Sequence, residues 1–162
     1  MQTHTCCFIG HSECYGLSEE WVRDAIEDLI NQGVTGFLCG GMGNFDWMCA
    51  RLTCGLKREH PHVRCDLVIP YLTFRVLEPK YFDSIVYPEG FEKYHFKAAI
   101  VARNRYLVDQ SAYALCYVMH SWGGAAQTYR RAVKKELQIQ NLYNTASLKH
   151  NPMGNTPKYP VW

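Results

Sequence analysis

The sequence predicts an α/β protein with a Rossmann-like, doubly wound and mostly parallel sheet of roughly five to seven strands and helices on both faces. Three observations predict this fold. Short apolar runs alternate with helical patterns along the chain, which is typical of a parallel sheet with crossover helices. Residues 67–69 are apolar without a break, as in a strand buried on both faces. Glycine-rich turns follow the first, second and fifth apolar runs.

Local patterns then define the individual elements. Ser18, followed by the acids Glu19 and Glu20, marks the start of a first helix that Gly33 ends. Further helices are expected over residues 47–59, 91–107 and 125–135. Apolar runs predict strands over residues 5–9, 34–39, 63–69, 84–87, 113–119 and 139–142.

The length of 162 residues suits one domain with a substantial core. We assign residues 1–143 to this domain and residues 144–162 to a C-terminal tail. The tail is expected to be partly ordered, because Tyr159, Val161 and Trp162 are apolar. The first residues carry no basic leader, and no stretch approaches the ~20 apolar residues of a membrane span. A cytoplasmic location without a membrane partner is therefore expected.

Charge and cysteine usage narrow the classes of function. A net charge of +2 is too small to hold long nucleic acid by charge alone, so any such role would have to be local. The eight cysteines form no C-x-x-C pair, and the seven histidines show no metal-ligand spacing. We therefore expect reduced cysteines in an apolar core, with no metal and no other cofactor.

A glycine loop follows the second predicted strand. Gly40, Gly41 and Gly43, with Met42 between them, let the backbone approach a ligand closely, because glycine has no Cβ. The loop lacks the G-x-G-x-x-G dinucleotide pattern, so a tight strand-to-helix turn explains it equally well. Asp46 either caps the following helix or contacts a ribose hydroxyl.

A second glycine turn follows the fifth predicted strand and opens a helix without acids in its first turn. Trp122, Gly123 and Gly124 form the turn, a context that favours anion binding by backbone N–H groups. Ser121 and Thr128 are expected to add hydroxyl donors.

The predicted helix before this turn is basic. Arg103 and Arg105 suit phosphate, because a guanidinium donates two parallel bonds, although a solvated helix face also explains such charge. Asn104 and Asp109 lie close by and could cap a helix or contact a sugar. The turn after the first strand adds the candidate ligand-binding residues Gly10, His11 and Ser12.

Together these motifs resemble the SLOG superfamily, named for the DNA-processing protein DprA (Smf) and the LOG phosphoribohydrolases, and most closely its YpsA-like branch. The resemblance implies a Rossmann-like fold that binds a nucleotide or a nucleotide-derived ligand at its glycine loops. It also implies a homo-oligomer paired through helices that flank the site. The segments that carry the resemblance are residues 7–11, 37–43 with Asp46, 69–71, 102–104, 109–111, and 123–124 with Thr128.

The sequence departs from the phosphoribohydrolase pattern at one chemically important position. That branch carries a glutamate in P-G-G-x-G-T-x-x-E, and the matching position here is Arg130. Glycosidic cleavage needs a carboxylate near a developing cation, which an arginine opposes. The main hypothesis is therefore non-catalytic sensing or sequestration of a nucleoside monophosphate, an ADP-ribose-like molecule or a cyclic nucleotide, a role that related domains perform in antiphage signalling.

Two alternatives remain. The first is a nucleotide N-glycosidase or phosphoribohydrolase whose acid comes from elsewhere, namely Glu13, Asp46 or Glu89. The second is a DprA-like adaptor that binds single-stranded DNA. The cations available for that role are Lys57, Arg58, Arg64, Lys134 and Lys135.

Overall fold

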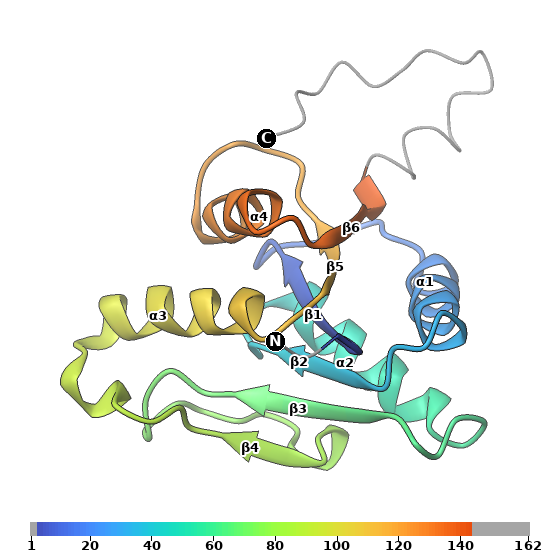
Figure 1. The fold of residues 1–162 in the computed structure, drawn as a ribbon, viewed down its shortest axis with the longest axis horizontal. Coiled ribbons are helices and arrows are strands. Elements are labelled where there is room, and N and C mark those ends of the chain that lie inside the picture. The colour runs from blue at the N-terminus through green and yellow to red at the C-terminus, as the bar shows by residue number, and fades with distance from the viewer. Residues whose placement is uncertain (1–2, 144–162) are drawn as a thin grey trace.

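A single six-stranded parallel sheet forms the centre of the protein (Figure 1), in the order β4-β3-β2-β1-β5-β6. The computed structural model describes residues 3–143. The strands confirm the predicted fold class. They are β1 (Thr5–Gly10), β2 (Gly36–Cys39), β3 (Arg64–Val68), β4 (Ser84–Val86), β5 (Tyr113–Tyr117) and β6 (Gln138–Asn141).

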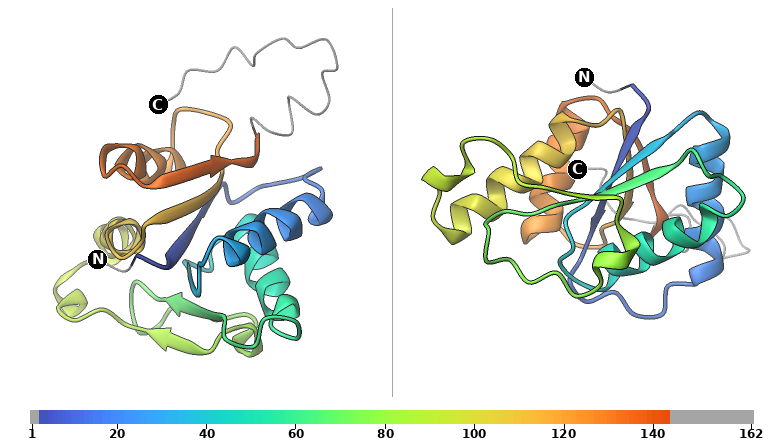
Figure 2. Two further views of the ribbon diagram at one scale, coloured as in Figure 1. Left: turned by 45° about the vertical axis from the view of Figure 1, so that its right-hand side comes forward. Right: turned by 90° about the horizontal axis from the view of Figure 1, so that it is seen from below.

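Four α-helices cover both faces of this sheet, as Figure 2 shows. Helices α1 and α2 pack together on one face, and α3 and α4 pack together on the other. The helices are α1 (Glu19–Asn31), α2 (Asn44–Leu56), α3 (Phe96–Asp109) and α4 (Gly124–Lys134), with short 3₁₀ helices η1 (Pro79–Tyr81) and η2 (Phe91–Lys93).

Two apolar clusters, one on each face of the sheet, hold these layers together. Phe8 of β1 and Phe37 of β2 stack with ring centroids 5.4 Å apart on the α1–α2 side, while Cys7 and Ile9 of β1 face the α3–α4 cluster. This alternation is the strand periodicity that lets one strand serve both cores. All eight cysteines are free and all but Cys54 are buried, as expected of thiols that act as core side chains.

Helix α1 shows how closely the local signals match the structure. Its N-cap is Ser18, whose Oγ accepts a hydrogen bond from the Trp21 N–H, and Glu19 and Glu20 occupy its first turn. After the helix, Gly33 has φ 107° and its N–H donates to the Ile30 carbonyl.

Two helix starts differ from the prediction. Helix α2 begins at Asn44, three residues before the expected start, because Gly43 at φ 102° turns the chain directly into the helix. Helix α3 begins at Phe96 instead of Phe91. Gly90 at φ 84° opens only the 3₁₀ turn η2, after which Tyr94 and His95 are extended.

The sheet order places a topological switch point between β1 and β5. The chain builds outward from β1 to β4 on one side, then crosses by α3 to β5 on the other. Ligands of open α/β sheets bind beyond the carboxyl ends of the strands at such a point. Within residues 3–143 no helix combines the length and the apolar character that a bilayer crossing requires. The predicted C-terminal tail lies outside the described residues.

Candidate functional site

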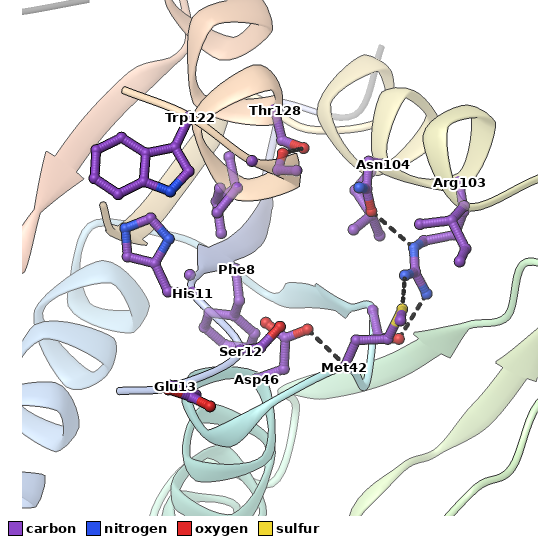
Figure 3. Close-up of a pocket in the computed structure, with 18 of the residues that line it drawn as sticks. Phe8, His11, Ser12, Glu13, Met42, Asp46, Arg103, Asn104, Trp122 and Thr128 are labelled. Carbon is purple, nitrogen blue, oxygen red and sulfur yellow. Dashed lines mark hydrogen bonds between the residues drawn. The ribbon is translucent and has the colours of Figure 1, made fainter. Parts of the chain in front are cut away.

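A cavity of about 560 Å³ opens at the switch point, beyond the carboxyl ends of β1, β2 and β5 (Figure 3). It brings together three glycine segments that are far apart in the sequence. The candidate residues that line it are Gly10, His11, Ser12, Gly40, Met42, Asp46, Arg103, Asn104, Trp122, Gly123, Gly124 and Thr128.

Four candidate residues lie outside the cavity wall. Gly41 and Gly43 shape the loop behind it, and Ser121 faces solvent while its carbonyl accepts a hydrogen bond from Arg130. Asp109 accepts two hydrogen bonds from Arg131, at 2.9 and 2.8 Å. Because both of its carboxylate oxygens are engaged at the end of α3, Asp109 is not placed to contact a sugar in this cavity.

The loop after β2 lies directly against the loop after β1. At Gly43, a Cβ would stand 2.4 Å from the Ser12 Cα, and the φ of 102° is one that other residues rarely adopt. The Asn44 N–H donates to the Ser12 carbonyl at 3.0 Å. The glycine is therefore required by the contact between these two loops, and this contact closes one wall of the cavity.

Among residues 3–143, Arg103 is the largest fully buried side chain, and it acts as a clamp on the strand ends. Its Nη1 donates to the carbonyls of Gly40 at 2.6 Å and Val68 at 3.0 Å, and its Nε donates to Asn104 Oδ1 at 2.9 Å. Its Nη2 lies 2.9 Å from Met42 Sδ. Four of its five N–H groups are thus engaged within the protein, which leaves one Nη2 proton for a ligand.

Asp46 places a buried carboxyl group on the floor of the cavity. Its Oδ2 accepts a hydrogen bond from the Met42 N–H at 3.0 Å. Burial raises the pKa of Asp46 to about 6, an effect that the Met42 hydrogen bond and the charge of Arg103 oppose. From the first turn of α2 the carboxyl group thus holds the glycine loop through the Met42 N–H, while Gly43 is the N-cap of the helix.

The first turn of α4 faces the cavity from the opposite side. Gly123 is its N-cap, with φ 90° and ψ 177°, and neither a side-chain cap nor an acid occupies the turn. The leading N–H groups of a helix have no partner within the helix and carry a partial positive charge. Thr128 is not available as the expected hydroxyl donor, because its Oγ1 already donates to the Gly124 carbonyl at 2.7 Å. This hydroxyl can only accept a hydrogen bond from a ligand.

An aromatic stack forms the wall beside this helix start. The ring centroids of His11 and His120 are 3.8 Å apart in a stacked arrangement, and those of His120 and Trp122 are 3.9 Å apart in another. His11 Nε2 accepts a hydrogen bond from the Met119 N–H at 2.9 Å. Burial, with the nearby His120, lowers the pKa of His11 to about 4, so this ring is neutral at physiological pH. Trp122 remains 68% exposed and presents an open face.

Sequence reasoning missed part of the cavity lining. His120 is the informative omission, since it lies between the end of β5 and the glycine turn, which is where a polar side chain reaches the carboxyl edge. Glu13, named only as a candidate acid, also lines the cavity, whereas Glu89 does not. The remaining missed residues are Phe8, Ile9, Ile100, Leu107, Met119 and Ala125.

Among residues 3–143, one group of side chains has donor atoms close enough to share a metal ion. Glu27, Glu59 and His60 bring such atoms within 4.8 Å of one another, outside the cavity. His60 Nε2 lies 3.1 Å from Glu27 Oε2. Hydrogen bonding between α1 and the turn before β3 explains that contact without an ion.

The fold and cavity define a Rossmann-like α/β protein with a polar site at its topological switch point. DNA processing protein A (DprA) from Streptococcus pneumoniae has a similar structure, with a TM-score of 0.63, 16% identity, and coverage of 85% of this chain and 49% of that one. The chain therefore spans about half the length of that protein. DprA from Helicobacter pylori, whose structure is described as revealing a single-stranded DNA binding mode, gives a TM-score of 0.61 at 17% identity, over 93% of this chain and 73% of that one.

These similarities show a shared fold. A scan against protein-family models finds no match for the sequence, and a search of curated proteins finds none either.

Proposed function

We propose that this protein binds a nucleoside phosphate at the switch-point cavity without cleaving it. One observation carries the proposal: the open first turn of α4 and the exposed ring of Trp122 face the same cavity of about 560 Å³. A nucleotide needs this combination, because its phosphate is an anion and its base is a flat aromatic surface.

The phosphate is assigned to the first turn of α4. Gly123 and Gly124 have no side chains, so an anion in the cavity can approach the N–H groups of Gly124 and Ala125. The first-turn residues of α4 include no carboxylate to compete for these groups. Arg103, buried across the cavity from Trp122 (Figure 3), adds a fixed positive charge.

The base is assigned to the exposed face of Trp122. Its inner face already stacks on His120, which stacks on His11, so the ring is held in one orientation before a ligand arrives. Base–aromatic stacking contributes about 1–3 kcal/mol per base and tolerates every base.

The residue at the position of the phosphoribohydrolase glutamate supports binding over hydrolysis. Arg130, which occupies the position of the phosphoribohydrolase glutamate, lies outside the cavity and donates to the Ser121 carbonyl at 2.9 Å. The Asp46 carboxyl group accepts a hydrogen bond from the Met42 N–H and so holds the glycine loop. The proposal therefore expects no release of free base from a bound nucleotide.

Isothermal titration of the full chain with deoxythymidine 5′-monophosphate tests this function. We expect saturable binding, weakened about tenfold by Trp122→Ala, because one stacked base is lost. Tyr15→Ala, which removes a similarly exposed ring outside the cavity, should leave the dissociation constant unchanged. Absence of binding, or chromatographic detection of free thymine after incubation, would refute the proposal.

Single-stranded DNA binding is the second candidate function, and the fold shared with two DprA proteins favours it. A nucleotide within a strand offers the same phosphate and base to the cavity. The cations named from the sequence do not support this second candidate, because Lys57 and Lys135 are helix C-caps and Arg64 begins β3. In a parallel sheet these positions lie at the opposite edge from the cavity.

Fluorescence anisotropy with a labelled oligodeoxythymidylate separates the two candidates. Displacement of the strand by deoxythymidine monophosphate would show one shared cavity, while binding of the monophosphate alone would exclude the second candidate. The DprA-like fold also supports a place in the SLOG superfamily. Its YpsA-like branch, a homo-oligomeric state, a signalling role and a cytoplasmic location stay predictions.

A further inference from the structure

A second cavity of about 450 Å³ lies between α3 and α4 and adjoins the switch-point cavity. Asn104 and Thr128 line both cavities, so one ligand can extend from the first into the second. We call this second cavity the arginine groove, after the three guanidinium groups that line it, those of Arg105, Arg130 and Arg131.

The helix periodicity explains why these side chains converge. On α3, Val101, Asn104 and Arg105 are spaced i, i+3 and i+4 and therefore share one face. On α4, Arg131 lies four residues after Gln127 and so shares its face, with Arg130 beside it. The two helices pack against each other, and these faces line the groove between them.

The groove carries more positive charge than the protein neutralises. Arg131 is paired with Asp109 through two hydrogen bonds. Arg130 donates to the Ser121 carbonyl, which leaves its charge uncompensated, and within residues 3–143 neither Arg105 nor Arg130 forms an ion pair. Two unpaired guanidinium groups flanking one cavity favour a doubly coordinated oxyanion.

We propose that the arginine groove is a second phosphate subsite, so that the ligand carries two phosphate groups, one at the start of α4 and one between Arg105 and Arg130. This inference rests on the proposed function and specifies its ligand class. Two sources supply that chemistry: a nucleoside diphosphate, or two linked nucleotides of a single strand.

Isothermal titration with three probes tests the proposal: deoxythymidine 5′-monophosphate, deoxythymidine 5′-diphosphate and the 5′-phosphorylated dithymidylate. We expect at least one of the two larger probes to bind about tenfold or more tightly than the monophosphate, since a charge-assisted hydrogen bond is gained. Arg105→Gln should remove that gain and leave the monophosphate affinity unchanged, because Arg105 lines only the arginine groove. Arg58→Gln, an exposed arginine outside both cavities, is the matched control and should alter neither affinity.

The outcomes separate this inference from the proposed function. Equal affinities for all three probes, or an equal weakening of all three by Arg105→Gln, would overturn the subsite while monophosphate binding stands. A gain for the diphosphate alone assigns the groove to a pyrophosphate ligand, and a gain for the dithymidylate assigns it to a single strand. Failure of every probe to bind would overturn the subsite together with the proposed function.

Discussion

Arg103 was predicted to neutralise the phosphate of a ligand, but four of its five N–H groups form hydrogen bonds within the protein. Its guanidinium joins the loop after β2 to the end of β3 through the Gly40 and Val68 carbonyls. The positive charge remains beside the cavity, but its position depends on these bonds. Arg103 is therefore first a positioning residue.

Replacing Arg103 tests this role. Arg103→Ala leaves the buried Gly40 and Val68 carbonyls without their donor and removes a large buried side chain, so the free energy of unfolding should fall by about 3–5 kcal/mol. Arg103→Lys should recover only part of the loss, because an ammonium group cannot reproduce the planar fork. Urea denaturation measures both, with exposed Arg58→Ala as a control expected to change stability by less than about 0.5 kcal/mol. Equal urea midpoints for Arg103→Ala and Arg58→Ala would contradict the role of Arg103 as a clamp on the strand ends.

Asp46 and His11 give opposite pH dependences to stability. The pKa of Asp46 is raised to about 6, so the folded state binds the extra proton and stability rises as pH falls from about 6 toward 4. The pKa of His11 is lowered to about 4, so the unfolded state binds the extra proton and stability falls as pH drops from about 6.5 to 4. In the native protein the two effects offset each other.

Single variants should reveal each effect in turn. Asp46→Asn should make the protein lose stability on acidification between pH 6.5 and 4, since Asp46 no longer offsets the His11 effect. His11→Gln should make the protein more stable at pH 4 relative to pH 6 than the native protein is, since His11 no longer offsets the Asp46 effect. Melting temperatures measured across this range provide the readout. Parallel pH profiles for both variants and the native protein would disprove the assignment.

At the scale of the elements, two glycine N-caps shape the site. Gly43 before α2 and Gly123 before α4 both combine a positive φ with ψ near 180°, a region that only glycine occupies readily. These caps turn the chain from the strand ends into the helices over very few residues. The first turn of α4 can face the cavity because no longer connection covers it.

Alanine substitutions should rank the two caps. Gly123→Ala meets no atom within 4 Å, so only backbone strain of about 1–3 kcal/mol should lower stability. Gly43→Ala adds a collision with the Ser12 Cα at 2.4 Å and should be the more damaging variant. Gly55→Ala, in the last turn of α2 and in open space, should stabilise the protein by up to about 1 kcal/mol. Thermal unfolding compares them, and a Gly43 variant no worse than the Gly123 variant would refute the role of the loop contact.

The elements were largely predictable because each strand and helix carries its own periodicity and cap. The starts of α2 and α3 were not predictable from the sequence. Gly43 and Gly90 both have positive φ, but Gly43 leads directly into an α-helix and Gly90 only into a 3₁₀ turn, and sequence alone does not separate these outcomes. For the candidate site, the glycine turns predicted that three distant segments meet at one sheet edge, where the cavity lies. The hydrogen-bond partners of single side chains were not predictable where they come from distant parts of the chain: Arg103 donates to the Gly40 and Val68 carbonyls, and Asp109 accepts from Arg131.

At the scale of the whole molecule, positive charge is divided between the two edges of the sheet. The arginine groove adjoins the cavity, whereas Arg64 at the start of β3 lies at the opposite edge and pairs with Asp66 at 3.1 Å. The net charge of +2 therefore conceals one concentrated positive region beside the cavity.

The salt dependence of oligodeoxythymidylate binding should reflect this division. Two phosphate contacts predict a slope of about −1.4 in log affinity against log salt concentration, at roughly −0.7 per phosphate of a single strand. Arg105→Gln should reduce the slope by about half, whereas Arg64→Gln should leave it unchanged. Anisotropy titrations at several salt concentrations measure it. A slope several times steeper, lowered by Arg64→Gln, would show that the strand wraps to the opposite edge.

The buried cysteines can be used to detect local unfolding of the protein. Burial raises the pKa of seven thiols and keeps them from reagents, while Cys54 is partly exposed. An alkylating agent applied to the native protein should modify Cys54 alone, and each further adduct seen by mass spectrometry would record a region that has opened. Cys39 sits at the end of β2 immediately before the site, so the rate at which it becomes labelled would report the local breathing of the cavity wall and its slowing by a bound ligand.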